Sequence, residues 1–184
     1  MAEDLTGRED SLDSSLIQRW KEGDERAATA LVERHAAALA RYVGSLGERD
    51  AADEVVQDAF VRAFASLEHF RGDSSLRTWL FTIARRLVVD RRRAFRRRRE
   101  VGNLEDVDAA TEYTALDGLI ASEAQRKVWG AVGKLSPTQR EVFLLRVNEG
   151  LSYKEIADVA GTTEGAARVH YHNALRTVKE NLNE

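Results

Sequence analysis

The sequence predicts an all-α protein built from two small helical domains. Only one of the 184 residues is proline, and alanine, leucine, arginine and glutamate, all strong helix formers, are abundant. Apolar residues recur at helical spacing through most of the chain. The acidic residues 100–121 interrupt that spacing, so we interpret them as a flexible linker. The chain is therefore expected to divide into a flexible N-terminus (1–13), a first domain (14–99), the linker, and a second domain (122–184).

Four helices are expected in the first domain. The first helix is expected to start near Ser14 or Ser15, because serine is a favourable N-cap residue. Over residues 51–67 valine, alanine and phenylalanine recur on one side, as in a helix with one buried face. A short polar loop over residues 69–75 precedes the last helix of this domain. The expected starts of the four helices are near Ser14 or Ser15, at Glu25, at Ala51 and near Leu76.

The fourth helix runs into a cluster of arginines. Residues 91–99 contain seven arginines, and residues 85–99 carry a net charge of +8 from nine arginines and one aspartate, although the whole chain has a net charge of −3. Such segregation of charge indicates a polyanionic partner, most plausibly nucleic acid. The alternative is a solvated basic helix face.

Composition excludes several other classes of function. The chain has no cysteine, and its four histidines lack the spacing of metal ligands, so neither a disulfide nor a metal or other cofactor is expected. The N-terminus is acidic, and no apolar run approaches the ~18 residues of a membrane span, which favours a cytoplasmic protein without membrane insertion. No nucleophile–base pair, phosphate-binding glycine loop or paired-carboxylate motif suggests an enzyme with a small-molecule substrate.

The second domain has well-marked helix starts. A helix is expected from near residue 122, and Ser136 and Ser152 each begin a capping box, the first with Pro137 behind it. The helix after Ser136 is expected to end at Gly150. Its expected buried residues are Val142, Phe143, Leu145 and Val147.

Residues 152–181 have the layout of a helix-turn-helix, in which a short capped helix, a turn containing Gly161 and a longer helix follow one another. In such a unit the second helix enters the major groove of DNA. Arg168 could then donate to guanine, Asn173 could pair with adenine, and His172 could donate or stack. The alternative is an ordinary helical hairpin.

Two ordered sets of motifs resemble a known family, the bacterial extracytoplasmic-function (ECF) sigma factors, group IV of the sigma-70 family. Residues 52–60, 70–72 and 79–85, together with Asp90 and Arg93, resemble region 2 of these proteins. The segments that resemble region 4 are 135–143, 150–157 and 163–165. The two sets occur in the right order and together cover nearly all of residues 14–181.

The resemblance implies a non-enzymatic role in bacterial transcription. Proteins of this family bind core RNA polymerase, recognise the minus-10 and minus-35 promoter elements and promote melting of promoter DNA. The resemblance also implies an anti-sigma factor as a regulatory partner. It further implies that the acidic linker threads toward the RNA exit path of the polymerase, either as a mimic of nucleic acid or as a solvating spacer.

The resemblance assigns residues to three binding functions. Those expected to dock on core polymerase are Asp53, Glu54, Gln57, Asp58 and Arg62; the alternative for these is helix capping and a solvated face. Those expected to bind the minus-10 element are Phe70, Arg71, Gly72, Asp73, Ser74, Arg77, Trp79, Arg85, Arg86, Arg92, Arg93 and Arg96. A flexible polar loop can hold an extruded base, and arginines neutralise phosphates. In the alternative, Asp73 and Ser75 cap the next helix and Trp79 belongs to the core.

The residues expected to bind the minus-35 element are Tyr153, Lys154, Thr163, Glu164, Arg168, Val169, His172 and Asn173. Thr163, as an N-cap, would leave backbone N–H groups free for a phosphate. The family usually carries polar or basic residues at several positions where this chain has Ala166, Val169, Asn173 and Leu175. We therefore expect an unusual base preference.

One competing interpretation is a helix-turn-helix regulator that binds operators and does not dock on core polymerase. Residues 135–181 alone would fit it. The acidic helix, the polar loop and the arginine cluster of the first domain have no role in a simple repressor, which argues against this alternative.

Overall fold

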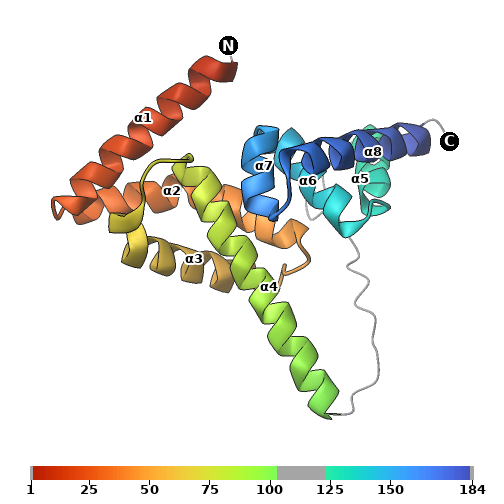
Figure 1. The fold of residues 1–184 in the computed structure, drawn as a ribbon, viewed down its shortest axis with the longest axis horizontal. Helices are drawn as coiled ribbons and strands as arrows, with labels where there is room; N and C mark the ends of the chain where they lie inside the picture. The colour runs from red at the N-terminus through yellow and green to blue at the C-terminus, as the bar shows by residue number, and fades with distance from the viewer. Residues whose placement is uncertain (1, 103–122, 183–184) are drawn as a thin grey trace.

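The computed structural model describes residues 2–102 and 123–182, and every regular element in these two ranges is a helix (Figure 1). The all-α prediction is thus confirmed for the described residues. The expected linker lies outside them, except for residues 100–102, which belong to a helix. The α-helices are α1 (Ala2–Lys21), α2 (Glu25–Ser45), α3 (Ala52–Ser66), α4 (Leu76–Gly102), α5 (Glu123–Gly133), α6 (Pro137–Val147), α7 (Tyr153–Ala160) and α8 (Glu164–Leu182), with a 3₁₀ turn η1 (Leu67–His69).

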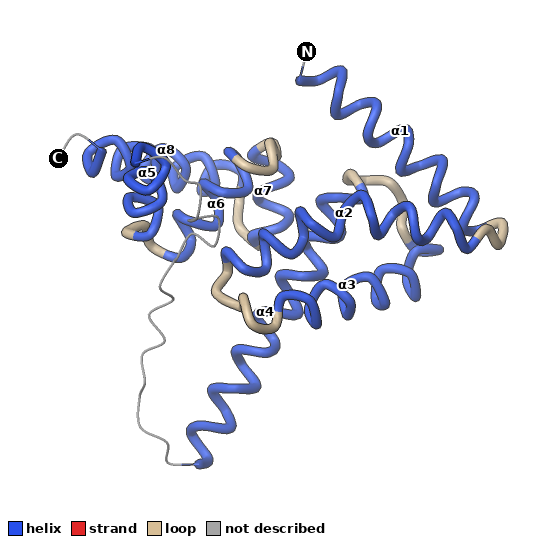
Figure 2. The backbone as a smooth tube through the Cα atoms, turned by 180° about the vertical axis from the view of Figure 1, so that it is seen from behind, coloured by secondary structure: helices blue, strands red, loops and turns tan. Residues whose placement is uncertain are grey.

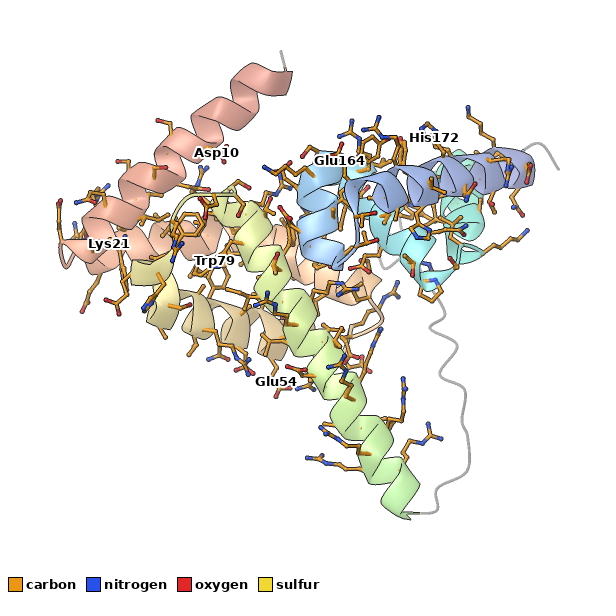
Figure 3. All side chains as sticks on the ribbon, viewed as in Figure 1. Asp10, Lys21, Glu54, Trp79, Glu164 and His172 are labelled. Atoms are coloured by element: carbon orange, nitrogen blue, oxygen red, sulfur yellow. The ribbon has the colours of Figure 1, made fainter. Side chains whose placement is uncertain are left out.

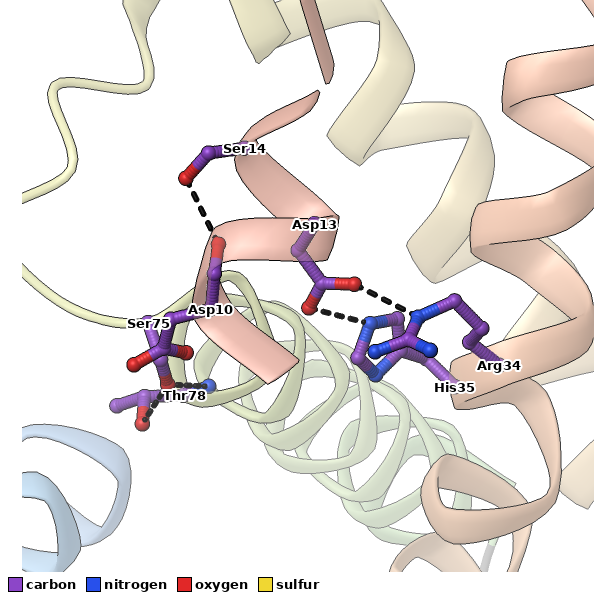
Figure 4. A network of polar contacts seen from close by, with 7 residues as sticks. All are labelled: Asp10, Asp13, Ser14, Arg34, His35, Ser75 and Thr78. Carbon is purple, nitrogen blue, oxygen red and sulfur yellow. Dashed lines mark hydrogen bonds and ion pairs between the residues drawn. The ribbon is translucent and has the colours of Figure 1, made fainter. Parts of the chain in front are cut away.

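The first helix starts earlier than the sequence indicated. It begins at Ala2 instead of near Ser14, and residue 13 is an interior helical position. Asp13 is buried and accepts hydrogen bonds from Arg34 Nε (2.9 Å) and His35 Nε2 (2.8 Å), both on α2 (Figure 4). Burial alone would raise the pKa of the Asp13 carboxyl, but the bonds and charges of His35 and Arg34 hold it below its ordinary value. This pairing anchors the middle of α1, and the expected start of the first helix near Ser14 or Ser15 is wrong.

The helices fall into a first group, α1 to α4, and a second group, α5 to α8. The helices α2, α3 and α4 form the centre of the first group. Alanines without exposed surface, Ala59 on α3 and Ala84 on α4, allow close approach of the helices. The ring of Tyr42 on α2 meets the ring of Phe81 on α4 edge-on, with 5.0 Å between the centroids. Beyond this core, the C-terminal half of α4 extends away from the other helices, as both Figure 1 and Figure 2 show.

The second group contains the predicted capping boxes. The Ser136 hydroxyl accepts from the Gln139 amide and the Gln139 side chain accepts from the Ser136 amide; Ser152 and Glu155 form the same reciprocal pair. Both boxes are confirmed. The expected burial of Val147 is wrong, because its side chain is 53% exposed at the last residue of α6.

Helix α6 is buried on two sides, which joins the two groups. Val142 and Leu145 belong to the same buried cluster as the cores of α1 to α4, together with residues of α7. Phe143 and Leu144 belong to a second cluster with α5 and α8. The first cluster therefore continues from one group of helices into the other, whereas the second cluster belongs to α5, α6 and α8 alone.

Candidate nucleic-acid and polymerase interface

The residues expected to dock on polymerase lie on one exposed face of α3. Their side chains are spaced by three or four residues along a helix whose opposite face carries the buried residues Val55, Val56 and Ala59. They are Asp53, Glu54, Gln57, Asp58 and Arg62, all exposed. Val61, which sequence reasoning missed, is 62% exposed on this face. Val61 could have been found from the sequence, because it is an apolar residue at a helical position where the periodicity predicts a polar one.

The loop before α4 combines exposed polar residues with a fixed aromatic pair. Arg71, Gly72 and Asp73 are exposed, and the backbone of Gly72 has φ +76°, a left-handed conformation that favours glycine. Phe70 packs on Trp79 with 5.0 Å between ring centroids.

Two residues near this loop have the structural roles that the sequence left as alternatives. Trp79, on α4, is half-buried against the core. Figure 3 labels it beside the loop. The Ser75 hydroxyl accepts from the Thr78 amide (3.1 Å), so Ser75 caps α4 (Figure 4).

The arginines of α4 occupy different environments. Arg86, Arg93 and Arg96 are exposed. Arg92 is also exposed, and its Nε lies 3.3 Å from a carboxylate oxygen of Glu48. Arg77 and Arg85, by contrast, bind glutamates of the second group of helices. The exposed arginines therefore form a basic surface on the extended end of α4, whereas Arg77 and Arg85 are already paired.

An aromatic residue, Phe95, lies among the exposed arginines of α4. Its side chain is 62% exposed, and the guanidinium carbon of Arg99 lies 5.7 Å from its ring centroid. Exposed aromatic rings interleaved with arginines suit contact with nucleic acid, because bases stack on rings while guanidinium groups bind phosphates.

The helices α7 and α8 form the predicted helix-turn-helix. Gly161 ends α7 in the left-handed conformation (φ +64°, ψ 42°), and the Thr163 hydroxyl accepts from the Ala166 amide (3.1 Å) as the N-cap of α8. The predicted residues at the start of α8 are exposed, apart from Asn173, which is half-buried. The exposed ones are Thr163, Glu164, Arg168, Val169 and His172; Glu164 and His172 are labelled in Figure 3.

Tyr153 and Arg168, both expected at the minus-35 element, meet at the surface. The Arg168 guanidinium carbon lies 5.0 Å from the Tyr153 ring centroid, and Arg168 Nη2 donates to Glu164 (2.9 Å). The guanidinium carbon of Arg146 on α6 lies 4.9 Å from the same ring centroid. Sequence reasoning missed Arg146, which precedes the helix-turn-helix and gave no local signal.

Residues around the expected minus-10 surface also contact the segment from α6 to α7. Arg85 Nε donates to Glu141 (2.8 Å), Arg77 donates to Glu149, and the Thr78 hydroxyl donates to Glu155 (3.0 Å). The buried Tyr42 hydroxyl donates to Glu141 (2.7 Å), and burial next to this carboxylate raises the Tyr42 pKa well above its ordinary value. No local sequence pattern could reveal these pairs, since their members are 56 to 99 residues apart.

Two further features are absent from the described ranges. Within them, no group of three or more metal-ligating side chains could hold an ion, and no helix is long and apolar enough to cross a membrane.

Two family models match the chain in succession. A model described as sigma-70 region 2 matches residues 31–99, and one described as sigma-70, region 4 matches residues 125–178. The ECF RNA polymerase sigma-E factor of Haemophilus influenzae is 31% identical over 195 residues, which cover 99% of this chain and 98% of the relative. The sigma-E factor of Escherichia coli K12 is 32% identical over 187 residues, which cover 97% and 95%.

Solved structures with a similar fold include two protein complexes. The sigma factor RpoE of Bartonella quintana, in complex with the anti-sigma factor NepR, superposes with a TM-score of 0.69 at 26% identity, covering 84% of this chain and 96% of that one. CnrH, in complex with the cytosolic domain of CnrY, gives a TM-score of 0.67 at 29% identity, covering 94% and 97%.

Proposed function

Because the chain belongs to the ECF sigma factors, we propose that it binds core RNA polymerase through α3 and promoter DNA through α4 and α8. It is an alternative sigma factor that directs transcription initiation. It acts in the bacterial cytoplasm and catalyses no reaction itself. The observation that carries the assignment of surfaces is that the polar face of α3, the arginines of α4 and the start of α8 are exposed on three separate elements of one chain.

The docking function of α3 is supported by its mixed surface. Gln57 and Asp58 lie one turn before the exposed Val61 on α3, and Asp53 lies one turn further along the same face. Protein interfaces commonly combine an apolar centre with a polar rim, because the centre is desolvated while the rim sets orientation. An operator-binding regulator would have no use for this face, and that alternative is not favoured.

The minus-10 function is supported by a loop beside a basic helix. Arg71 and Asp73 present donors and acceptors at the loop, where an extruded base could be bound by its Watson–Crick edge. The exposed Arg86, Arg93 and Arg96 would bind the phosphates of the neighbouring duplex. The Phe70–Trp79 pair would hold the loop in place.

The minus-35 function is supported by the geometry of α7 and α8. The N-terminal residues of a recognition helix face base edges, and Arg168, Val169 and His172 are exposed there. The N-cap Thr163 and the exposed Lys154 would bind phosphates. Val169 would contribute an apolar contact, such as one to a thymine methyl group.

We also propose that an anti-sigma factor regulates this chain, because both structural relatives were solved with such a protein or with the cytosolic domain of a partner. The complete function is tested by run-off transcription with purified core polymerase, with and without the protein, on a genomic fragment library. New discrete start sites that share two spaced upstream elements are expected. Sequence-specific DNA binding without new start sites would instead support the operator-binding regulator.

A further inference from the structure

One face of α4 is buried within the first group of helices and continues along the extended end of this helix. Leu80, Ala84 and Val88 are buried and recur every four residues, which places them on one side of α4. Arg91 and Phe95 follow on the same side, at further steps of three and four residues. Phe95 is 62% exposed, on the part of α4 that extends away from the other helices (Figure 1 and Figure 2). The packing face of α4 therefore ends in a large apolar side chain that the described helices leave mostly uncovered.

An ion pair joins this face of α4 to the proposed docking face of α3. Arg91 Nη1 lies 3.1 Å from a carboxylate oxygen of Glu54, which Figure 3 labels where the two helices meet. Asp58 and Val61 follow Glu54 by four and seven residues, so they lie on the same side of α3. The resulting surface strip has an apolar residue at each end and charged residues between them. It consists of Val61, Asp58, Glu54, Arg91 and Phe95.

The arginines that we assign to duplex phosphates lie on a different side of α4. A helix turns by about 100° per residue, so around the helix axis Arg93 lies about 160° from Phe95 and Arg86 lies about 180° from it. A duplex bound by Arg86 and Arg93 would therefore lie on the side of α4 that is turned away from Phe95. The ring of Phe95 can then contact a second partner while α4 holds DNA.

The surroundings of Phe95 indicate the chemistry of that partner. The guanidinium carbon of Arg99 lies 5.7 Å from the ring centroid, and Arg98, three residues after Phe95, is exposed on the same side of the helix. Aromatic residues and arginine are the residue types enriched in protein–protein interfaces, where a few large side chains carry most of the binding energy. A protein surface with an apolar pocket flanked by carboxylates would complement this ring and its arginines.

We propose that the polymerase-docking surface continues from α3 onto the extended end of α4, and that Phe95 is its apolar anchor there. Core polymerase contacts Val61 at one end of the strip and Phe95 at the other, with carboxylates beside the arginines around the ring. This inference rests on the proposed docking of α3, to which the ion pair between Arg91 and Glu54 connects it. It adds a polymerase contact to a helix that the proposed function assigns to DNA alone.

Replacement of Phe95 tests the contact in the full chain. Phe95→Ala should lower the affinity for core polymerase by about tenfold, because truncation of an aromatic anchor removes much of the binding energy of an interface. Phe95→Leu keeps an apolar side chain but offers no ring on which a base could stack, so it should retain most of the affinity. The control Leu12→Ala truncates another exposed apolar residue, 47% exposed on α1, and should bind as the wild type does. All affinities are measured by competition with a labelled sigma factor.

Photocrosslinking identifies the partner of Phe95 directly. The photoreactive amino acid p-benzoylphenylalanine is introduced at position 95, and the protein is irradiated in complex with core polymerase and promoter DNA. We expect a cross-link to a polymerase subunit, and none when the same amino acid replaces Leu12. Unchanged core affinity in Phe95→Ala, or cross-links from position 95 to DNA alone, would overturn the inference.

The variant Asp53→Ala/Gln57→Ala separates this inference from the proposed function. If it loses core affinity while Phe95→Ala does not, the docking of α3 stands and its continuation onto α4 is wrong. If the wild type itself does not compete for core polymerase, the proposed function and this inference fail together.

Discussion

The guanidinium group of Arg168 lies over the ring of Tyr153, with 5.0 Å from its central carbon to the ring centroid. Arg146 lies 4.9 Å from the same centroid, and Glu164 binds Arg168 from the preceding turn of α8. Tyr153 and Glu164 thus restrict an exposed arginine whose side chain would otherwise sample many rotamers. An arginine restricted in this way is prepared for contact with a base, because less side-chain entropy is lost on binding.

Replacing Tyr153 is therefore expected to weaken promoter binding through Arg168. Tyr153→Leu removes the ring and should reduce affinity for the minus-35 element by about 0.5–1 kcal/mol, the usual strength of an exposed cation–π contact. Tyr153→Phe keeps the ring and should bind nearly as the wild type does. Arg168→Ala should cost roughly 1–3 kcal/mol on the promoter if Arg168 reads a base. The affinities of all three variants for promoter and random duplexes are measured by fluorescence anisotropy. An equal loss of affinity for Arg168→Ala on every sequence would identify a phosphate contact instead of a base contact.

Local features of this fold could be predicted from the sequence. The capping boxes at Ser136 and Ser152 are readable because each hydrogen-bond pattern spans only three residues. The exposed face of α3 is readable because its buried residues recur at helical spacing on the opposite side. The same argument applies to Thr163, whose hydroxyl caps α8 as expected.

Long-range features could not be predicted in this way. The residues before Ser14 have no clear helical spacing of apolar residues, so the sequence did not predict a helix there. Asp13 is nevertheless bound by Arg34 and His35, which are 21 and 22 residues away in the sequence. Helix α6 contributes residues to two clusters, so its burial does not follow a single face and Val147 was misassigned. The acceptor role of Glu141 depends on helices that precede it by more than fifty residues.

Removing polar groups from α3 should weaken binding to polymerase. Asp53→Ala/Gln57→Ala deletes two exposed side chains of the proposed docking face and should lower affinity for core polymerase by tenfold or more, about 1.4 kcal/mol. Helicity should remain, because neither side chain contributes to the core. Gln18→Ala/Glu33→Ala, which removes an amide and an acid from exposed positions elsewhere, should bind as the wild type does. Unchanged core affinity in the α3 variant, measured by competition with a labelled sigma factor, would reject this docking face.

The extended end of α4 should determine how strongly DNA binding depends on salt. Arg93 and Arg96 are exposed, and each phosphate contact contributes about 0.9 to the slope of log K against log salt. Arg93→Gln/Arg96→Gln should therefore reduce the slope by about 2 on any duplex. The control Lys21→Gln/Arg26→Gln makes the same change in charge at exposed positions at the end of α1 and in the first turn of α2. Equal slopes for the variant and the control would show that α4 does not contact the backbone.

The anchor between α1 and α2 should make stability depend on pH in a specific range. The folded-state pKa of Asp13 lies below its ordinary value of 3.8, so the folded form favours the carboxylate. Its contribution to stability is fully present above the unfolded pKa and is lost as the pH falls through the folded pKa. Asp13→Asn leaves Arg34 and His35 without the carboxylate and should lower the free energy of unfolding at pH 7 by about 3 kcal/mol, as for other broken buried pairs.

This difference between wild type and Asp13→Asn should begin to shrink as the pH falls below the ordinary pKa of 3.8, and it should be lost once the pH lies below the folded pKa, where Asp13 of the wild type is also neutral. Urea denaturation followed by circular dichroism at several pH values measures it. Asp158→Asn provides the control, because it makes the same change at an exposed position on α7, and it should change stability little at any pH. A difference for Asp13→Asn that stays constant as the pH falls well below 3.8 would show that the variant acts through packing and not through the charge of Asp13.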